Sequence, residues 1–149
     1  MGPSSGERRA SGELRLNRAR TGTTLRRLAY LPENDKAVLV YTTFPSPEAA
    51  EEVGAALVEA GLAACVNILP AMTSIYIWQG ARQRDAEAVM IVKTRRALAD
   101  RVMADIRARH SYETPALVVI PVEGGSSDYL AWIATQTGGP NGQEPSTDE

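Results

Sequence analysis

Two residues of this 149-residue chain could carry chemistry: the single histidine, His110, and the single cysteine, Cys65. An imidazole titrates near neutral pH and is the commonest metal ligand in proteins. A cysteine thiolate binds Cu(I) and other thiophilic metals, and beside a histidine it can act as a nucleophile. The residue types therefore suggest either metal binding by His110 and Cys65 or covalent catalysis by the pair.

Both residues also have an ordinary structural explanation, which stays open. A cationic His110 after Arg107 and Arg109 would offset the dipole at a helix C-terminus. Cys65 stands in the apolar run 62–66, where a cysteine is commonly a small buried hydrophobe. One Cys and one His cannot complete a four-ligand zinc site within a single chain, although symmetry-related copies could add ligands.

The sequence around His110 indicates how its ring would be held. His110 stands between a helix-like run and a strongly apolar run over 116–122. The Thr114-Pro115 step stiffens this joint, because proline fixes its own φ and favours extended geometry in the preceding residue. Tyr112 lies in the same turn, and rigid turns of this kind often carry function.

Composition narrows the class of protein. Hydrophobic residues make up 44% and charged residues 23% of the chain, as in one soluble globular domain. Residues 34–149 carry a net charge of −6, from nine basic and fifteen acidic residues, so we expect no nucleic-acid partner. No apolar run approaches the roughly 20 residues that cross a bilayer, so we expect no membrane association. A single cysteine fits a reducing compartment, and we expect a cytoplasmic protein.

The chain divides into three parts. Residues 1–33 hold seven Arg against three Glu and no hydrophobic period, which predicts a disordered Arg-rich extension. Residues 138–149 are rich in Gly, Pro and acidic residues, which predicts a disordered tail. The folded domain is expected over 35–137.

A strand–helix–strand pattern occurs twice in the domain. The predicted elements are a strand over 37–44, a helix after Ser46 that Gly61 ends, a strand over 62–69, a strand over 88–94, a helix capped by Thr94, and a strand over 116–122. The alternating run 73–78 continues the second strand beyond a kink at Pro70. It forms a long hairpin with the strand over 88–94. The result is an α+β, ferredoxin-like (βαββαβ) fold with an extended β-hairpin arm, in which the first and third strands are central. A short helix over 128–135 closes the domain.

The hairpin arm is longer than a domain of this size needs. Two helices cannot bury the apolar residues on both of its faces, and such a surplus is typical of pairing with another chain. We therefore expect a homo-oligomer.

Over about residues 37–133, the domain resembles the CutA family of divalent-cation-tolerance proteins. The segments that carry the resemblance are AACVNI (63–68), SIYIWQG (74–80), Glu87 with VKT (92–94), HSYETP (110–115) and DYLAWI (128–133). The resemblance implies a ferredoxin-like homotrimer held by the arm, similar to the PII signalling proteins, and a role in tolerance of divalent metals, copper in particular. His110 and Cys65 match the family's histidine and second-strand cysteine.

The chain also departs from the family motif. Ser111 replaces a common proline and Ala116 a common acid, while Thr42 and Arg109 stand where some members have a Cys and a second His. The implied set of metal ligands is therefore thinner in this chain.

Two functions are compatible with these observations. The first is a trimeric metal-tolerance protein that binds copper or another divalent cation weakly through few ligands, His110 and Cys65. The alternative is a PII-like signalling or adaptor trimer that binds a small molecule or an unknown partner protein in clefts between subunits, with Lys93, Tyr112 and Trp132 as cleft residues. The sequence has no G-x-G-x-x-G or G-x-S-x-G motif and no paired Cys or His, so we do not expect an enzyme.

Overall fold

The computed structural model describes residues 33–138. The elements in chain order are a short 3₁₀ helix η1 (Glu33–Asp35), β1 (Ala37–Phe44), α2 (Pro47–Glu59), β2 (Cys65–Trp78), β3 (Ala81–Arg95), α3 (Arg96–Arg109), β4 (Leu117–Pro121) and α4 (Ser127–Gln136). The predicted N-terminal extension and C-terminal tail lie, apart from Glu33 and Gly138, outside the described residues.

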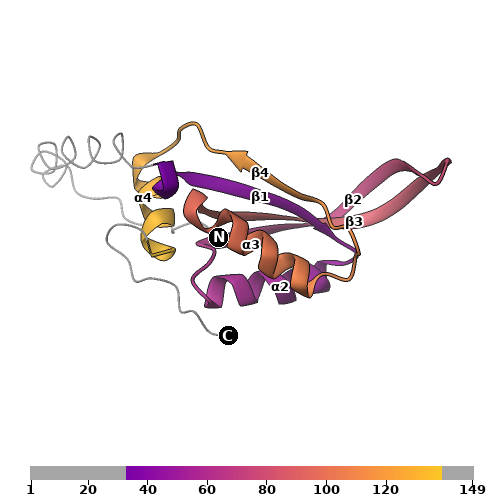
Figure 1. Ribbon diagram of the computed structural model, residues 1–149, viewed down its shortest axis with the longest axis horizontal. Coiled ribbons are helices and arrows are strands. Elements are labelled where there is room, and N and C mark those ends of the chain that lie inside the picture. The colour runs from indigo at the N-terminus through magenta and orange to yellow at the C-terminus, as the bar shows by residue number, and fades with distance from the viewer. Residues whose placement is uncertain (1–32, 139–149) are drawn as a thin grey trace, which may run out of the picture.

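One antiparallel sheet with the strand order β2-β3-β1-β4 organises the domain. The prediction that the first and third strands are central is confirmed. Helices α2 and α3 lie side by side on one face, while α4 packs near the end of the sheet opposite the arm (Figure 1). Pro121 pairs with Val38 at the end of edge strand β4, a position where proline's missing N–H is tolerated.

The start and end of α2 follow from local sequence. The Ser46 hydroxyl accepts a hydrogen bond from the Ala49 N–H at 3.2 Å, and Pro47 occupies the first turn. Gly61, at φ 72°, ends the helix. The Leu62 N–H then donates to the Leu57 carbonyl at 3.0 Å.

Two boundaries differ from the sequence prediction. The strand predicted from residue 62 begins only at Cys65, because Leu62 uses its N–H in the helix stop and residues 62–64 complete the turn. Thr94, predicted to cap α3, is still in β3 opposite Val38. Its hydroxyl donates to the Leu62 carbonyl at 2.7 Å, and Arg95 is the N-cap.

The arm consists of the outer halves of β2 and β3 and extends past the ends of both helices (Figure 1). The pairing is irregular between Leu69 and Met72, as the predicted kink at Pro70 requires, and then runs in register to Trp78 opposite Ala81. The two turn residues have φ of 50° and 79°, which matches the type I′ turns that suit two-residue hairpins.

The core fills the space between the sheet and the helices α2 and α3. Its fully buried large side chains include Val40, Phe44, Leu57, Met90, Val92, Val102 and Ile106. Gly54 allows α2 to approach the sheet closely, since a Cβ there would lie 2.7 Å from a methyl group of Val66. The helix layer therefore covers β1 and the inner half of β3, which carry or contact the candidate site residues.

Candidate functional site

His110 joins the end of β1 to the loop after α3. Its Nε2 lies 2.6 Å from the Thr43 carbonyl oxygen, and its Nδ1 accepts a hydrogen bond from the Tyr112 N–H at 3.0 Å. The ring stacks on Phe44, with centroids 4.5 Å apart and planes inclined by 17°. Since Nδ1 is the acceptor, the hydrogen-bond network assigns the proton to Nε2, which donates to Thr43.

These contacts decide what His110 has available for a metal ion. Both ring nitrogens are engaged with backbone groups of the same chain. A metal ion binds to a lone pair on an imidazole nitrogen. In this tautomer Nε2 carries the proton, and the one lone pair, on Nδ1, already accepts the hydrogen bond from the Tyr112 N–H. His110, as placed here, is a structural connector.

Tyr112 continues this cluster toward the arm. Its hydroxyl donates to Glu87 Oε2 at 3.2 Å, and its ring lies 4.7 Å from that of His110. Burial and the negative charge of Glu87 together raise the pKa of the Tyr112 phenol to about 12. Tyr112 therefore ties the loop to the base of the arm as a neutral hydrogen-bond donor.

Cys65 and Lys93 belong to a second cluster, beneath α4. They are directly opposed on β2 and β3, and the Lys93 ammonium donates to the Tyr129 hydroxyl at 2.8 Å. The Cys65 sulfur lies 3.8 Å from the same hydroxyl. Burial lowers the pKa of Lys93, but the hydrogen bond to Tyr129 and the nearby thiol outweigh it, so that the pKa is raised and Lys93 remains cationic.

Trp132 lies beside this second cluster. Its ring centroid is 5.7 Å from that of Tyr129, as expected for aromatic residues three apart on one helix face. Lys93 and Trp132 were predicted from the sequence as cleft residues, and Tyr129 was not among them. The structure makes Tyr129 the residue that connects Lys93 with Cys65. No local signal could reveal this, because the contact joins β2 and β3 to a helix more than thirty residues later.

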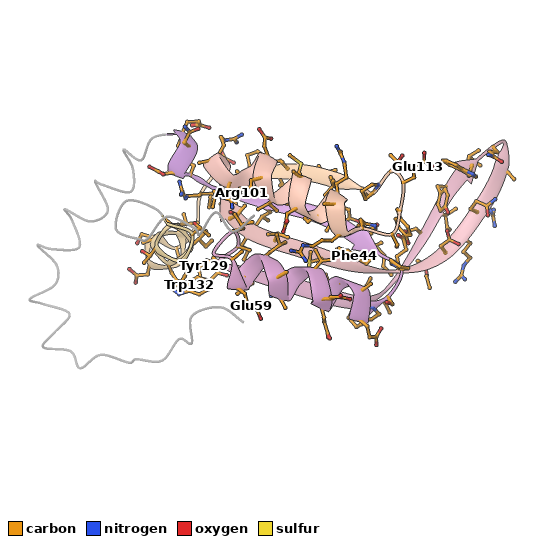
Figure 2. All side chains as sticks on the ribbon, turned by 60° about the horizontal axis from the view of Figure 1, so that its bottom comes forward. Phe44, Glu59, Arg101, Glu113, Tyr129 and Trp132 are labelled. Atoms are coloured by element: carbon orange, nitrogen blue, oxygen red, sulfur yellow. The ribbon has the colours of Figure 1, made fainter. Side chains whose placement is uncertain are left out.

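His110 and Cys65 do not meet within one chain. His110 binds Thr43, which is opposite Val89, whereas Cys65 is opposite Lys93. Val89 and Lys93 are four residues apart on β3, or about 13 Å at roughly 3.3 Å per residue. Figure 2 agrees, since Tyr129 and Trp132 lie at one end of the domain and Phe44 at the other. A Cys65–His110 catalytic pair or shared metal site is therefore not formed in the single chain.

Other sets of metal ligands are also missing from the part of the chain that the structure describes. Among residues 33–138 no group of three or more His, Cys, Asp or Glu side chains is arranged to hold a metal ion. The side chains of one chain, as arranged, thus do not fit a preformed metal centre. None of the helices within this range is long and apolar enough to span a membrane.

Comparison with known proteins places these features in a family. Residues 38–136 match the family described as the CutA1 divalent ion tolerance protein. The match covers well over half of the chain and includes the arm and both side-chain clusters. The chain therefore belongs to the CutA1 divalent ion tolerance family.

Individual relatives agree with this assignment. The divalent-cation tolerance protein CutA of Thermus thermophilus is 42% identical over 100 residues, which cover 67% of this chain and 97% of that protein. The chloroplastic protein CutA 1 of Oryza sativa is 39% identical over 101 residues, 68% of this chain but only 57% of the rice protein. The structure of the periplasmic divalent cation tolerance protein CutA from Archaeoglobus fulgidus superposes with a TM-score of 0.66 at 40% identity, over 68% of this chain and 98% of that one.

Proposed function

We propose that this protein is a cytoplasmic, non-enzymatic, trimeric divalent-cation tolerance protein with a ferredoxin-like protomer. Family membership supports the link to divalent cations. The hairpin arm supports assembly, because Ile75, Ile77 and Trp78 are 64%, 67% and 61% exposed on a single chain. Exposed apolar side chains grouped in this way are typical of an interface, and we infer that copies of the chain cover them.

Metal binding in this proposal is weak and involves copper or another divalent cation. A cation that binds His110 must replace one of two backbone hydrogen bonds, to Thr43 or from Tyr112. Cys65 is only 7% exposed, so it contributes only if α4 moves. The cost of these rearrangements is subtracted from the affinity, which is the physical reason for expecting weak binding.

Native mass spectrometry with and without one equivalent of Cu(II) per chain tests the proposal. We expect a trimer that takes up one copper per chain and loses it in His110→Ala but not in the neighbouring control Arg107→Ala. A trimer that takes up no copper would contradict the metal role and leave the assembly intact. A monomer would contradict the assembly.

The second candidate function is a PII-like signalling or adaptor trimer, and the Lys93 cluster favours it. Lys93 keeps its positive charge, because its pKa is raised, and it lies beside the aromatic pair of Tyr129 and Trp132. Both rings are partly exposed, and a cation next to such aromatic surface can bind an anionic, stacking ligand. Tyr112 belongs to the other cluster, so it could share such a cleft with Lys93 only across two subunits.

Lys93→Met distinguishes the two functions. This substitution removes the ammonium and keeps an apolar stem of similar length. The signalling function predicts that the variant loses capture of its partner from cell extract while copper uptake is unchanged. Equal capture by both proteins would exclude Lys93 from partner binding.

A further inference from the structure

A pocket of about 410 Å³ lies between the N-terminal half of α2 and the C-terminal end of α3. Its lining residues are Phe44, Ala49, Glu52, Val53, Arg109 and Ser111. Small-molecule pockets in proteins commonly have volumes of about 300–1,000 Å³. His110, Cys65 and the Lys93 cluster do not line this pocket, although it adjoins His110, whose ring stacks on the lining residue Phe44.

The floor of the pocket is apolar and rigid. Phe44 and Val53 are 1% and 5% exposed and belong to the main core. Phe44 is also held by stacking against His110. Figure 2 shows Phe44 between the two helices, at the end from which the arm extends. Because these two side chains are almost fully covered, the apolar surface open to a ligand comes from half-buried Ala49 and the hydrocarbon stems of Glu52 and Arg109. The rigid floor beneath them keeps the ordering cost of binding low.

The rim carries opposite charges on opposite helices. Glu52 comes from α2 and Arg109 is the last residue of α3. Arg109 Nε contacts Asp105 at 3.4 Å. Within residues 33–138 the terminal guanidinium nitrogens of Arg109 and the Glu52 carboxylate have no partner, and the two side chains do not pair with each other. The charges therefore flank the pocket instead of closing it.

Compensation of helix dipoles explains only part of this arrangement. Arg109 is in the last turn of α3, where a cation is favourable. Glu52 is the sixth residue of α2, beyond the first turn to which the dipole effect is confined. Neither helix end explains why the two charges face an apolar pocket from both sides.

We propose that this pocket binds a small zwitterion in which an apolar body separates a carboxylate from an ammonium group. The carboxylate contacts the free guanidinium nitrogens of Arg109 and the Ser111 hydroxyl. The ammonium contacts Glu52, and the apolar body lies on Ala49 and the hydrocarbon stems of Glu52 and Arg109, above Phe44 and Val53. Charge-assisted hydrogen bonds at both ends give selectivity for molecules that carry both charges. This inference depends neither on metal binding nor on the trimer.

Binding of ε-aminocaproate to the full chain, followed by NMR titration, tests the proposal. We expect saturable shifts at pocket residues, together with at least about tenfold weaker binding of caproate and of hexylamine, each of which lacks one charge. Equal affinity for caproate or hexylamine would overturn the zwitterion assignment. The absence of saturable shifts at the pocket would overturn the site itself.

Matched variants separate the pocket from general electrostatics. Glu52→Gln and Arg109→Gln are each expected to weaken ε-aminocaproate binding about tenfold. Glu51→Gln and Arg107→Gln remove the same charges at exposed positions on the same helices outside the lining, and both should bind like the unaltered chain. If the control variants lose as much affinity as the pocket variants, the interaction is a non-specific charge effect and the proposal fails.

Discussion

At the scale of single residues, hydrogen bonds decide what each candidate group can do. Both ring nitrogens of His110 form hydrogen bonds with backbone groups, and Lys93 donates a hydrogen bond to the Tyr129 hydroxyl. Residue type alone suggested a ligand and a cleft cation. The contacts in the structure make His110 a connector between two segments and keep the Lys93 ammonium charged and fixed in place.

The Tyr112 phenol gives a prediction about pH. Burial and Glu87 raise its pKa from the ordinary value of 10 to about 12 in the folded protein. A raised pKa means that the stabilisation from Tyr112 is fully present below pH 10 and is lost as the pH rises toward 12. The free energy of unfolding, measured by urea denaturation, should therefore fall more steeply over this interval in the unaltered protein than in Tyr112→Phe. Parallel pH profiles would contradict the assignment.

Two buried threonines that differ in their hydrogen bonding allow a matched comparison of stability. Thr42 and Thr94 are both fully buried, but the Thr94 hydroxyl donates to Leu62, whereas the Thr42 hydroxyl has no partner among residues 33–138. An unmade buried hydrogen bond costs about 1–3 kcal/mol. In urea denaturation, Thr42→Val should raise the free energy of unfolding by about 1 kcal/mol, and Thr94→Val should lower it by a similar amount. Destabilisation of both variants by the same amount would show that the Thr42 hydroxyl has a partner.

At the scale of elements, one arginine anchors the last helix. The Arg95 side chain is only 8% exposed and donates to the carbonyl groups of Thr137 and Gly138 at 3.0 and 3.1 Å. It also pairs with Asp35 at 3.3 Å. A single guanidinium thus holds the C-terminal end of α4, the start of α3 and η1 together.

Arg95→Lys should release α4, because an ammonium cannot reproduce three contacts made by a planar fork. We expect the free energy of unfolding to fall by about 1–3 kcal/mol and Cys65 beneath α4 to react faster with an alkylating reagent. The neighbouring control is Arg96→Lys, whose side chain is 37% exposed and pairs with Glu33, and which should cost less than about 1 kcal/mol. Equal alkylation rates in the two variants would contradict an anchoring role for Arg95.

Elements set by local rules could be predicted, and contacts between distant elements could not. Ser46, Pro47 and Gly61 define α2 from adjacent residues, and the apolar run of β1 is continuous enough to identify. The prediction that Thr94 caps α3 was wrong, because its hydroxyl donates a hydrogen bond to the carbonyl of Leu62, thirty-two residues away. The Thr43 partner of His110 and the Tyr129 partner of Lys93 lie even farther away in the sequence, so these contacts could be found only from the fold.

At the scale of the whole molecule, the arm determines assembly in our proposal. Ile75→Asp with Ile77→Asp places two charges on one face of the arm, where the proposed interface would have to bury them at high cost. We expect this double variant to be monomeric by native mass spectrometry, with an unchanged circular dichroism spectrum. The control is Arg82→Lys with Arg84→Lys, directly opposite Ile77 and Ile75 on the same face, which keeps both the charge and the apolar side chains there and should remain trimeric. A trimeric isoleucine variant would exclude this face from the interface.

The regular pairing of the arm makes it a place where the chain can change length. From Met72–Glu87 to Trp78–Ala81 the partners stay in register, and a two-residue turn closes the hairpin, with open space where a Cβ on Gly80 would lie. Because side chains alternate between faces with a period of two, adding two residues to each strand keeps every existing face, whereas adding one to each inverts the pairs beyond the insertion. Lengthening in such double steps would give protomers of different reach from the same core, and a designer could vary the arm without altering the helices.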